Sequence, residues 1–79
     1  MSHEENIVYF VNPSYESALI GVSTDGIAVY DYWKMVDYLC ITDGMEVEEA
    51  VEFMEYNTLR ALPYIKNAPV VIISKEDDV

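Results

Sequence analysis

The chain has 79 residues and carries 15 Asp or Glu against 4 Lys or Arg, which gives a formal net charge of −11. A chain of this length forms one domain, and its 52% apolar and 13% aromatic content is enough for a hydrophobic core, which excludes wholesale disorder. The single cysteine excludes an internal disulfide and a cysteine-based zinc site, and no apolar run approaches the ~20 residues that span a bilayer. We therefore expect one soluble domain over 1–79, with frayed tails at 1–6 and 75–79 and without a signal peptide.

The first predicted element is a strand over Ile7–Val11 (IVYFV). This run is β-branched and aromatic, and Asn12-Pro13 closes it.

A β-hairpin is predicted next, around Asp25-Gly26. Apolar runs at residues 17–24 and 27–30 flank this pair, which supplies the two positive φ angles of a type I′ turn. A two-residue loop fixes the register and places Gly21 opposite Tyr30.

Two helices follow the hairpin. Asp31 is a good N-cap for a helix whose apolar face repeats at i, i+3, i+4 and i+7, and Gly44 ends that helix with a left-handed residue. A second helix is predicted from residue 46 to residue 62, where Pro63 stops it. Glu46 is a mediocre N-cap for this helix.

A last strand is predicted over Val70–Ser74 (VVIIS). The element order is therefore β-ββ-α-α-β. We expect an α+β fold with a small, mainly antiparallel sheet and a two-helix hairpin packed on one of its faces. The pattern leaves the place of the last strand in the sheet open.

No constellation of catalytic side chains is visible. The only histidine, His3, lies in a predicted tail, and Cys40 falls on an apolar stripe with no histidine near it in sequence. Neither a nucleophile elbow nor a phosphate-binding loop occurs, and Asp25 and Asp43 each precede a glycine as turn residues, not as calcium ligands. We expect a non-enzymatic protein with no cofactor and no metal site.

The negative charge is concentrated in the second helix. Glu48, Glu52 and Glu55 are spaced i, i+4, i+7 and form a row along its solvent face. No Lys or Arg occurs from Met35 to Thr58, so the row is uncompensated within the helix pair. The carboxylates from residue 43 to residue 55 are Asp43, Glu46, Glu48, Glu49, Glu52 and Glu55.

Two interpretations of this acidic stretch stay open. One is a solvated face that serves solubility, which is the usual meaning of a charge run. The other is a surface that binds a basic groove, because carboxylates one turn apart lie about 5–6 Å from each other, on the scale of the charges in a nucleic acid strand. The same charge argues against direct binding of nucleic acid or of an anionic membrane.

Aromatic residues are the second unusual feature, with 7 Tyr and 1 Trp. Trp33, Tyr38 and Tyr56 fall off the apolar stripes and are candidates for partner contacts, since Tyr and Trp are favoured hot-spot residues. They can equally cover the edges of a small core, or bury area in a homodimer.

From Ala28 to Pro69 the sequence contains AVYDYWKMVDYL and then DGMEVEEAVEFMEYNTLRALPY. Over roughly half of the chain it resembles a group of small acidic proteins of bacteriophages and prophages of Firmicutes, with the patterns A-V-Y-D-Y-x-K-M, G-M-x-x-E-E-A-x-E and Y-N-T-x-R-A-L-P-Y. Glu46 departs from the group, in which such helices usually start with Ser or Thr. We expect a structural role for Thr58, and leave Asn57 and Arg60 open between a structural role and a contact surface.

The resemblance implies a phage origin and a place in the cytoplasm of a bacterial host. Small acidic phage proteins are often inhibitors, including anti-CRISPR and other anti-defence proteins, some of which look like DNA mimics. The leading hypothesis is an inhibitor that binds the basic, nucleic-acid-binding surface of a host protein, such as a CRISPR effector. The alternative is a small structural or assembly module that forms a homodimer.

Overall fold

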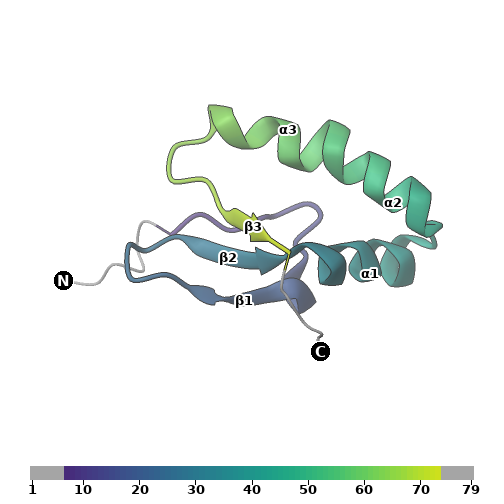
Figure 1. Ribbon diagram of the computed structural model, residues 1–79, viewed down its shortest axis with the longest axis horizontal. Helices are drawn as coiled ribbons and strands as arrows, with labels where there is room; N and C mark the ends of the chain where they lie inside the picture. The colour runs from purple at the N-terminus through teal and green to yellow at the C-terminus, as the bar shows by residue number, and fades with distance from the viewer. Residues whose placement is uncertain (1–6, 74–79) are drawn as a thin grey trace.

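The computed structural model describes residues 7–73, so the predicted tails at 1–6 and 75–79 and the histidine at position 3 lie outside the described residues. Figure 1 shows α1 continuing from the end of β2, with α2 and α3 in one line along the side of the molecule where β3 lies. In chain order the elements are β1 (Leu19–Val22), β2 (Ala28–Asp31), α1 (Tyr32–Asp43), α2 (Val47–Phe53), a π-helical segment (Met54–Thr58), α3 (Leu59–Ala61) and β3 (Val70–Ile72), with 3₁₀ turns at Glu16–Ala18 and Leu62–Tyr64.

The fold is α+β, as the sequence predicts. The three strands lie in the order β1-β2-β3, with β2 in the middle. β1 pairs with β2 antiparallel and β2 pairs with β3 parallel, so the sheet is mixed where a mainly antiparallel one was expected. The parallel pair follows from the helices, because a chain that crosses over through a helix returns in the same direction.

The predicted register of the hairpin is wrong by one residue. Gly21 lies opposite Val29, not Tyr30, and a bulge between Leu19 and Gly21 shifts the register by one residue more, so that Leu19 lies opposite Tyr30. The turn has three loop residues, because the carbonyl of Ser23 accepts from the N–H of Gly26 at 2.9 Å and the N–H of Ser23 donates to the carbonyl of Ile27 at 2.8 Å.

The side chain of Ser23 explains the longer loop. Its hydroxyl oxygen accepts from the N–H of Asp25 at 3.3 Å and from the N–H of Ile27 at 3.2 Å. Only Gly26, with φ 81°, takes a positive φ in this loop. A type I turn followed by a left-handed glycine therefore replaces the type I′ turn, which needs two such residues.

The predicted strand at Ile7–Val11 is also wrong. This segment carries no strand pairing. The N–H of Phe10 donates to the hydroxyl of Tyr30 at 3.1 Å, and the Phe10 ring packs on Tyr15 and Tyr30 with centroid distances of 5.3 and 4.7 Å. An aromatic run buries its side chains by lying across a sheet as effectively as by joining its edge, and β propensity does not distinguish the two.

The first helix agrees with its prediction at both ends. Asp31 caps it by accepting from the N–H of Lys34 at 3.1 Å, and Gly44 ends it with φ 68°. Met35, Val36 and Leu39 of this helix are buried.

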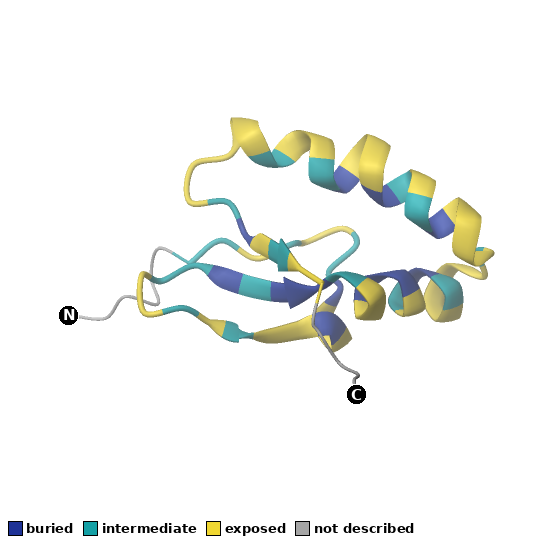
Figure 2. Cartoon of the chain, in the orientation of Figure 1, coloured by how far each residue is buried: buried dark blue, intermediate teal, exposed yellow. Residues whose placement is uncertain are grey.

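The second predicted helix is interrupted. Its residues form α2, the π-helical segment and α3 in sequence, and the N–H of Leu59 bonds the carbonyl of Met54, five residues back. The Oε1 of Glu49 accepts from the N–H of Glu46 at 3.3 Å, which supports the start of α2. Figure 2 shows the buried positions of α2 and the π-helical segment on the side toward the rest of the molecule, with the opposite side exposed.

The core lies between the sheet, the helices and the segment before β1 (residues 7–18), which we call the N-terminal segment. No helix within residues 7–73 is long and apolar enough to cross a membrane. The buried apolar residues are Tyr15, Ala18, Ala28, Tyr30, Met35, Val36, Leu39, Ala50 and Met54.

Substitution of Gly44 by Ala should lower the free energy of unfolding by about 1 kcal/mol, because a Cβ strains the left-handed conformation that ends α1. Gly21→Ala is the matched control, since Gly21 has an ordinary φ and no atom within 4 Å of an added Cβ. Urea unfolding measures both. A Gly44→Ala variant as stable as Gly21→Ala would contradict the assigned C-cap.

Candidate functional site

The predicted acidic row is fully presented to solvent. Glu48 and Glu52 of α2 and Glu55 of the π-helical segment are exposed. We call the acidic surface the six exposed carboxylates Asp43, Glu46, Glu48, Glu49, Glu52 and Glu55.

The first carboxylates of this surface also suit the helix that carries them. Glu48 and Glu49 lie in the first turn of α2, where negative charge offsets the positive end of the helix dipole. Glu52 and Glu55 lie beyond that turn, so the helix dipole does not account for them.

Trp33 lies beside this surface. Its indole is 50% exposed and meets the ring of Tyr32 edge-on at a centroid distance of 4.9 Å. Burial raises the pKa of Tyr32 above its ordinary value, and the negative charge of Glu55 raises it further. Tyr32 therefore links the indole to the acidic surface, because the first turn of α1 lies near the π-helical segment.

The other two predicted aromatics differ from each other. Tyr56 is 67% exposed and follows Glu55 directly. Tyr38 is half-buried: its hydroxyl lies 3.1 Å from the hydroxyl of Ser14, and its ring lies 5.5 Å from that of Tyr15. The acidic surface thus has two exposed large rings near it, and the ring of Tyr38 packs mainly inside the molecule.

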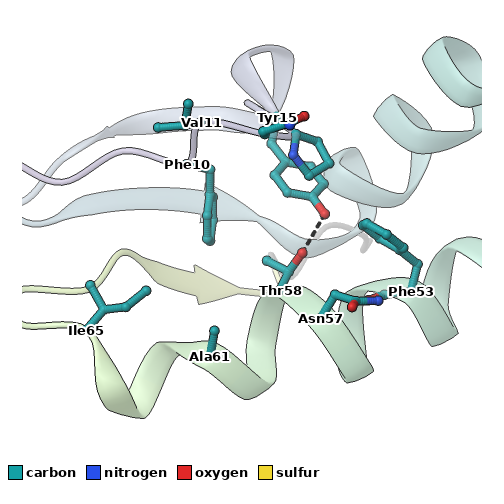
Figure 3. A pocket seen from close by; sticks show the side chains of 10 residues that line it. Phe10, Val11, Tyr15, Phe53, Asn57, Thr58, Ala61 and Ile65 are labelled. Carbon is teal, nitrogen blue, oxygen red and sulfur yellow. Dashed lines mark hydrogen bonds between the residues drawn. The ribbon is translucent and has the colours of Figure 1, made fainter.

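A pocket that the sequence does not reveal lies against the helical element formed by α2, the π-helical segment and α3, on its side toward the N-terminal segment. It has a volume of about 180 Å³ and opens between the N-terminal segment and the π-helical segment (Figure 3). Phe10, Val11, Phe53, Ala61 and Ile65 form most of its wall.

Two buried hydroxyl groups meet in this pocket. The hydroxyl of Tyr15 lies 2.7 Å from Oγ1 of Thr58, and either atom can donate (Figure 3). Tyr15 is 0% exposed and Thr58 is 9% exposed. Thr58 therefore has the structural role that the sequence predicts for it.

The backbone around the pocket is irregular on both sides. Tyr15 has φ 51°, a left-handed conformation that is rare for a residue with a large side chain. On the other side the π-helical segment carries Asn57, whose Nδ2 donates to the carbonyl of Phe53 at 3.1 Å. Both kinds of irregularity occur often where a protein binds a ligand.

One signal in the sequence points to this pocket in part. Thr58 is the only polar member of an otherwise apolar helical stripe, and a buried hydroxyl requires a partner elsewhere in the core. Nothing in the sequence identifies Tyr15 as that partner.

Among the residues that the structure describes, no basic side chain lines the pocket or belongs to the acidic surface. Arg60 of α3 is exposed, and within residues 7–73 no three His, Cys, Asp or Glu are grouped so that they could hold a metal ion. No protein-family model matches the chain, and no curated protein or solved structure is significantly similar to it.

Alkaline pH should destabilise the fold through Tyr15. Burial raises the pKa of this phenol above its ordinary 10.0, the hydrogen bond with Thr58 opposes that shift, and the charge of Asp43 adds to it. Above about pH 10 the unfolded state therefore holds fewer protons than the folded state, and the free energy of unfolding falls as the pH rises. The stabilisation that the neutral Tyr15 phenol contributes is complete below the pKa of this phenol in the unfolded state. It is lost as the pH rises through its pKa in the folded state.

Urea unfolding between about pH 8 and pH 11 measures this effect. The decline should be shallower in Tyr15→Phe than in Tyr64→Phe, the control, because the ring of Tyr64 is 88% exposed. Equal slopes in the two variants would contradict the assigned environment of Tyr15.

Proposed function

We propose that this protein is a non-enzymatic inhibitor that uses its acidic surface to bind a basic, nucleic-acid-binding surface of a host protein. The observation that carries the proposal is the set of six exposed carboxylates between residues 43 and 55, in a stretch from 35 to 58 that contains no Lys or Arg. The acidic surface would occupy a groove that normally holds phosphates.

Folding alone does not favour this arrangement. Like charges at i and i+4, such as Glu48 and Glu52, destabilise a helix by a few tenths of a kcal/mol. A mixture of acidic and basic residues would make the helix equally soluble without this cost. Retention of the uncompensated row therefore supports a role in attracting a positively charged partner, which accelerates association at low salt.

The exposed rings of Trp33 and Tyr56 offer apolar area that a partner can bury, which charged groups alone do not provide. Long-range attraction is screened by salt, so a stable complex also needs buried contacts. Tyr56 follows Glu55 directly and Trp33 packs on Tyr32, whose hydroxyl feels the charge of Glu55; both rings are exposed, and each can bury area against a partner with little loss of conformational entropy.

The resemblance to phage proteins suggests the class of partner. A phage inhibitor of this kind would act in the bacterial cytoplasm on a defence protein or another nucleic-acid-handling protein, for example a CRISPR effector. The net charge of −11 opposes direct binding of this chain to nucleic acid.

A charge-reversal pair tests the proposal. Glu52→Lys with Glu55→Lys changes the net charge from −11 to −7 within the acidic surface. Glu16→Lys with Asp25→Lys makes the same change elsewhere, at two exposed positions outside α2 and the π-helical segment. The immobilised protein and both variants are exposed to lysate of a Firmicutes host, and bound proteins are eluted with a 30-base-pair DNA duplex or with high salt.

We expect the duplex to elute a nucleic-acid-binding protein, because the duplex and the acidic surface compete for one basic groove of that protein. Capture should fall at least tenfold in the Glu52/Glu55 variant and by less than twofold in the control, since only the former reverses charge inside the interface. Equal losses in the two variants, or capture indifferent to salt and to DNA, would contradict the proposal.

A second candidate function is assembly through a homodimer. The observation that favours it is a group of exposed apolar side chains on one face of the sheet. Val29 lies opposite Val70, and the alternation of side chains along β3 places Ile72 on the same face as Val70. Val70 and Ile72 are 45% and 39% exposed, and Ile20 in the bulge of β1 is 54% exposed. These exposed side chains are uncharged, so a second copy could approach this face without local repulsion.

Sedimentation equilibrium distinguishes this function from the first. A dimer built on the sheet face should dissociate in Val70→Lys and persist in Val47→Lys, a control in which a similarly exposed valine of α2 changes in the same way. A monomer at about 100 µM would rule out the assembly function.

A further inference from the structure

The pocket beside the π-helical segment has the size of a small aromatic molecule. Its volume is about 180 Å³. An apolar cavity of about 150 Å³ in another protein is large enough to hold benzene. Most of the wall here is apolar as well, with the rings of Phe10 and Phe53 on two sides and Ala61 and Ile65 on a third, while Asn12 and Asn57 add polar side chains (Figure 3).

The hydroxyl pair in the pocket has one proton that its own hydrogen bond does not use. Tyr15 and Thr58 each carry one hydroxyl proton, and a single hydrogen bond of 2.7 Å joins them. One of the two protons serves this bond. The other proton is not used by this bond and is available to an acceptor atom that enters the pocket.

Electrostatics exclude an anion from this position. No Lys, Arg or His lines the pocket, and the chain carries a net charge of −11. The negative charge of Asp43 also acts on the hydroxyl of Tyr15. The acceptor should therefore belong to an uncharged group such as a ketone or an amide, because a carboxylate or phosphate would be repelled.

We propose that this pocket binds an uncharged, ring-sized organic molecule whose single carbonyl-type acceptor takes a hydrogen bond from the Tyr15–Thr58 hydroxyl pair. The site does not depend on the acidic surface or on any protein partner. A small molecule fits better than an inserted aromatic side chain of a partner, because Phe and Trp rings carry no carbonyl-type acceptor.

Three probes of similar shape test the ligand chemistry by amide chemical shifts. Acetophenone has the ring and the acceptor, ethylbenzene has the ring without the acceptor, and benzoate has the ring with a negative charge. Acetophenone should shift amides of the pocket saturably, with a Kd on the order of 1 mM, as is usual for a fragment of this size. Ethylbenzene should bind roughly five- to tenfold more weakly and benzoate more weakly still.

A paired variant isolates the contribution of the hydroxyls. Tyr15→Phe with Thr58→Val removes both hydroxyls together and so leaves no orphaned donor, which keeps the fold stable. Acetophenone and ethylbenzene should then bind with equal affinity. Tyr64→Phe with Thr42→Val is the matched control, because both residues are exposed and neither lines the pocket, and it should retain the difference.

A second variant tests the location. Ala61 is exposed on α3 and lines the pocket, so Ala61→Met should fill the volume and abolish the binding of both probes while the fold is kept. Absence of saturable shifts, equal affinity for acetophenone and ethylbenzene in the unmodified protein, or full binding by Ala61→Met would each overturn the proposal.

Discussion

The buried packing of the Tyr15 ring beside Thr58 is the constraint on which the arrangement of this small protein depends. It joins residues 43 positions apart and ties the N-terminal segment to the long helical element at a buried point. Both residues are polar yet lie in the core, and the hydrogen bond between them offsets part of the cost of burying their hydroxyls. It also explains why a large residue is held at φ 51°, since burial of the Tyr15 ring and its hydrogen bond offset the strain.

The distribution of charge follows from the small volume of the core. The core is supplied by one face of each helix and by the inner positions of β2, and the carboxylates of the acidic surface remain at exposed positions. A domain of this size has little volume in which to neutralise a charge, so net charge of this magnitude is tolerated only at the surface. Asp31 is the buried exception, and it caps α1 through the N–H of Lys34.

The sequence predicts well where a local signal decides the structure. Asp31 and Gly44 define the ends of α1 because a cap acts on its own turn, and the hydrophobic period locates the second helix for the same reason. The errors arise where a specific side-chain contact decides the structure against the intrinsic propensity of the segment. The hydroxyl of Ser23 lengthens the hairpin loop, and the ring of Tyr30 draws Phe10 across the sheet in place of an edge pairing. The π-helical segment has no sequence signature, because an inserted residue costs little local propensity and is set by what the helix packs against.

For the candidate sites, the exposed charges were predictable and the pocket was not. Exposure of Glu52 and Glu55 follows from helical periodicity, whereas the pocket requires the N-terminal segment to meet Thr58, which no local pattern encodes. The two sites share one helical element, with Thr58 of the pocket at a buried position and Glu52 and Glu55 at exposed ones. Burial of Ala50, Met54 and Thr58 sets which side of that element faces the core, and therefore which side presents Glu52 and Glu55 to solvent. The residues that build the core therefore also decide where the acidic surface lies, although no carboxylate of that surface is buried.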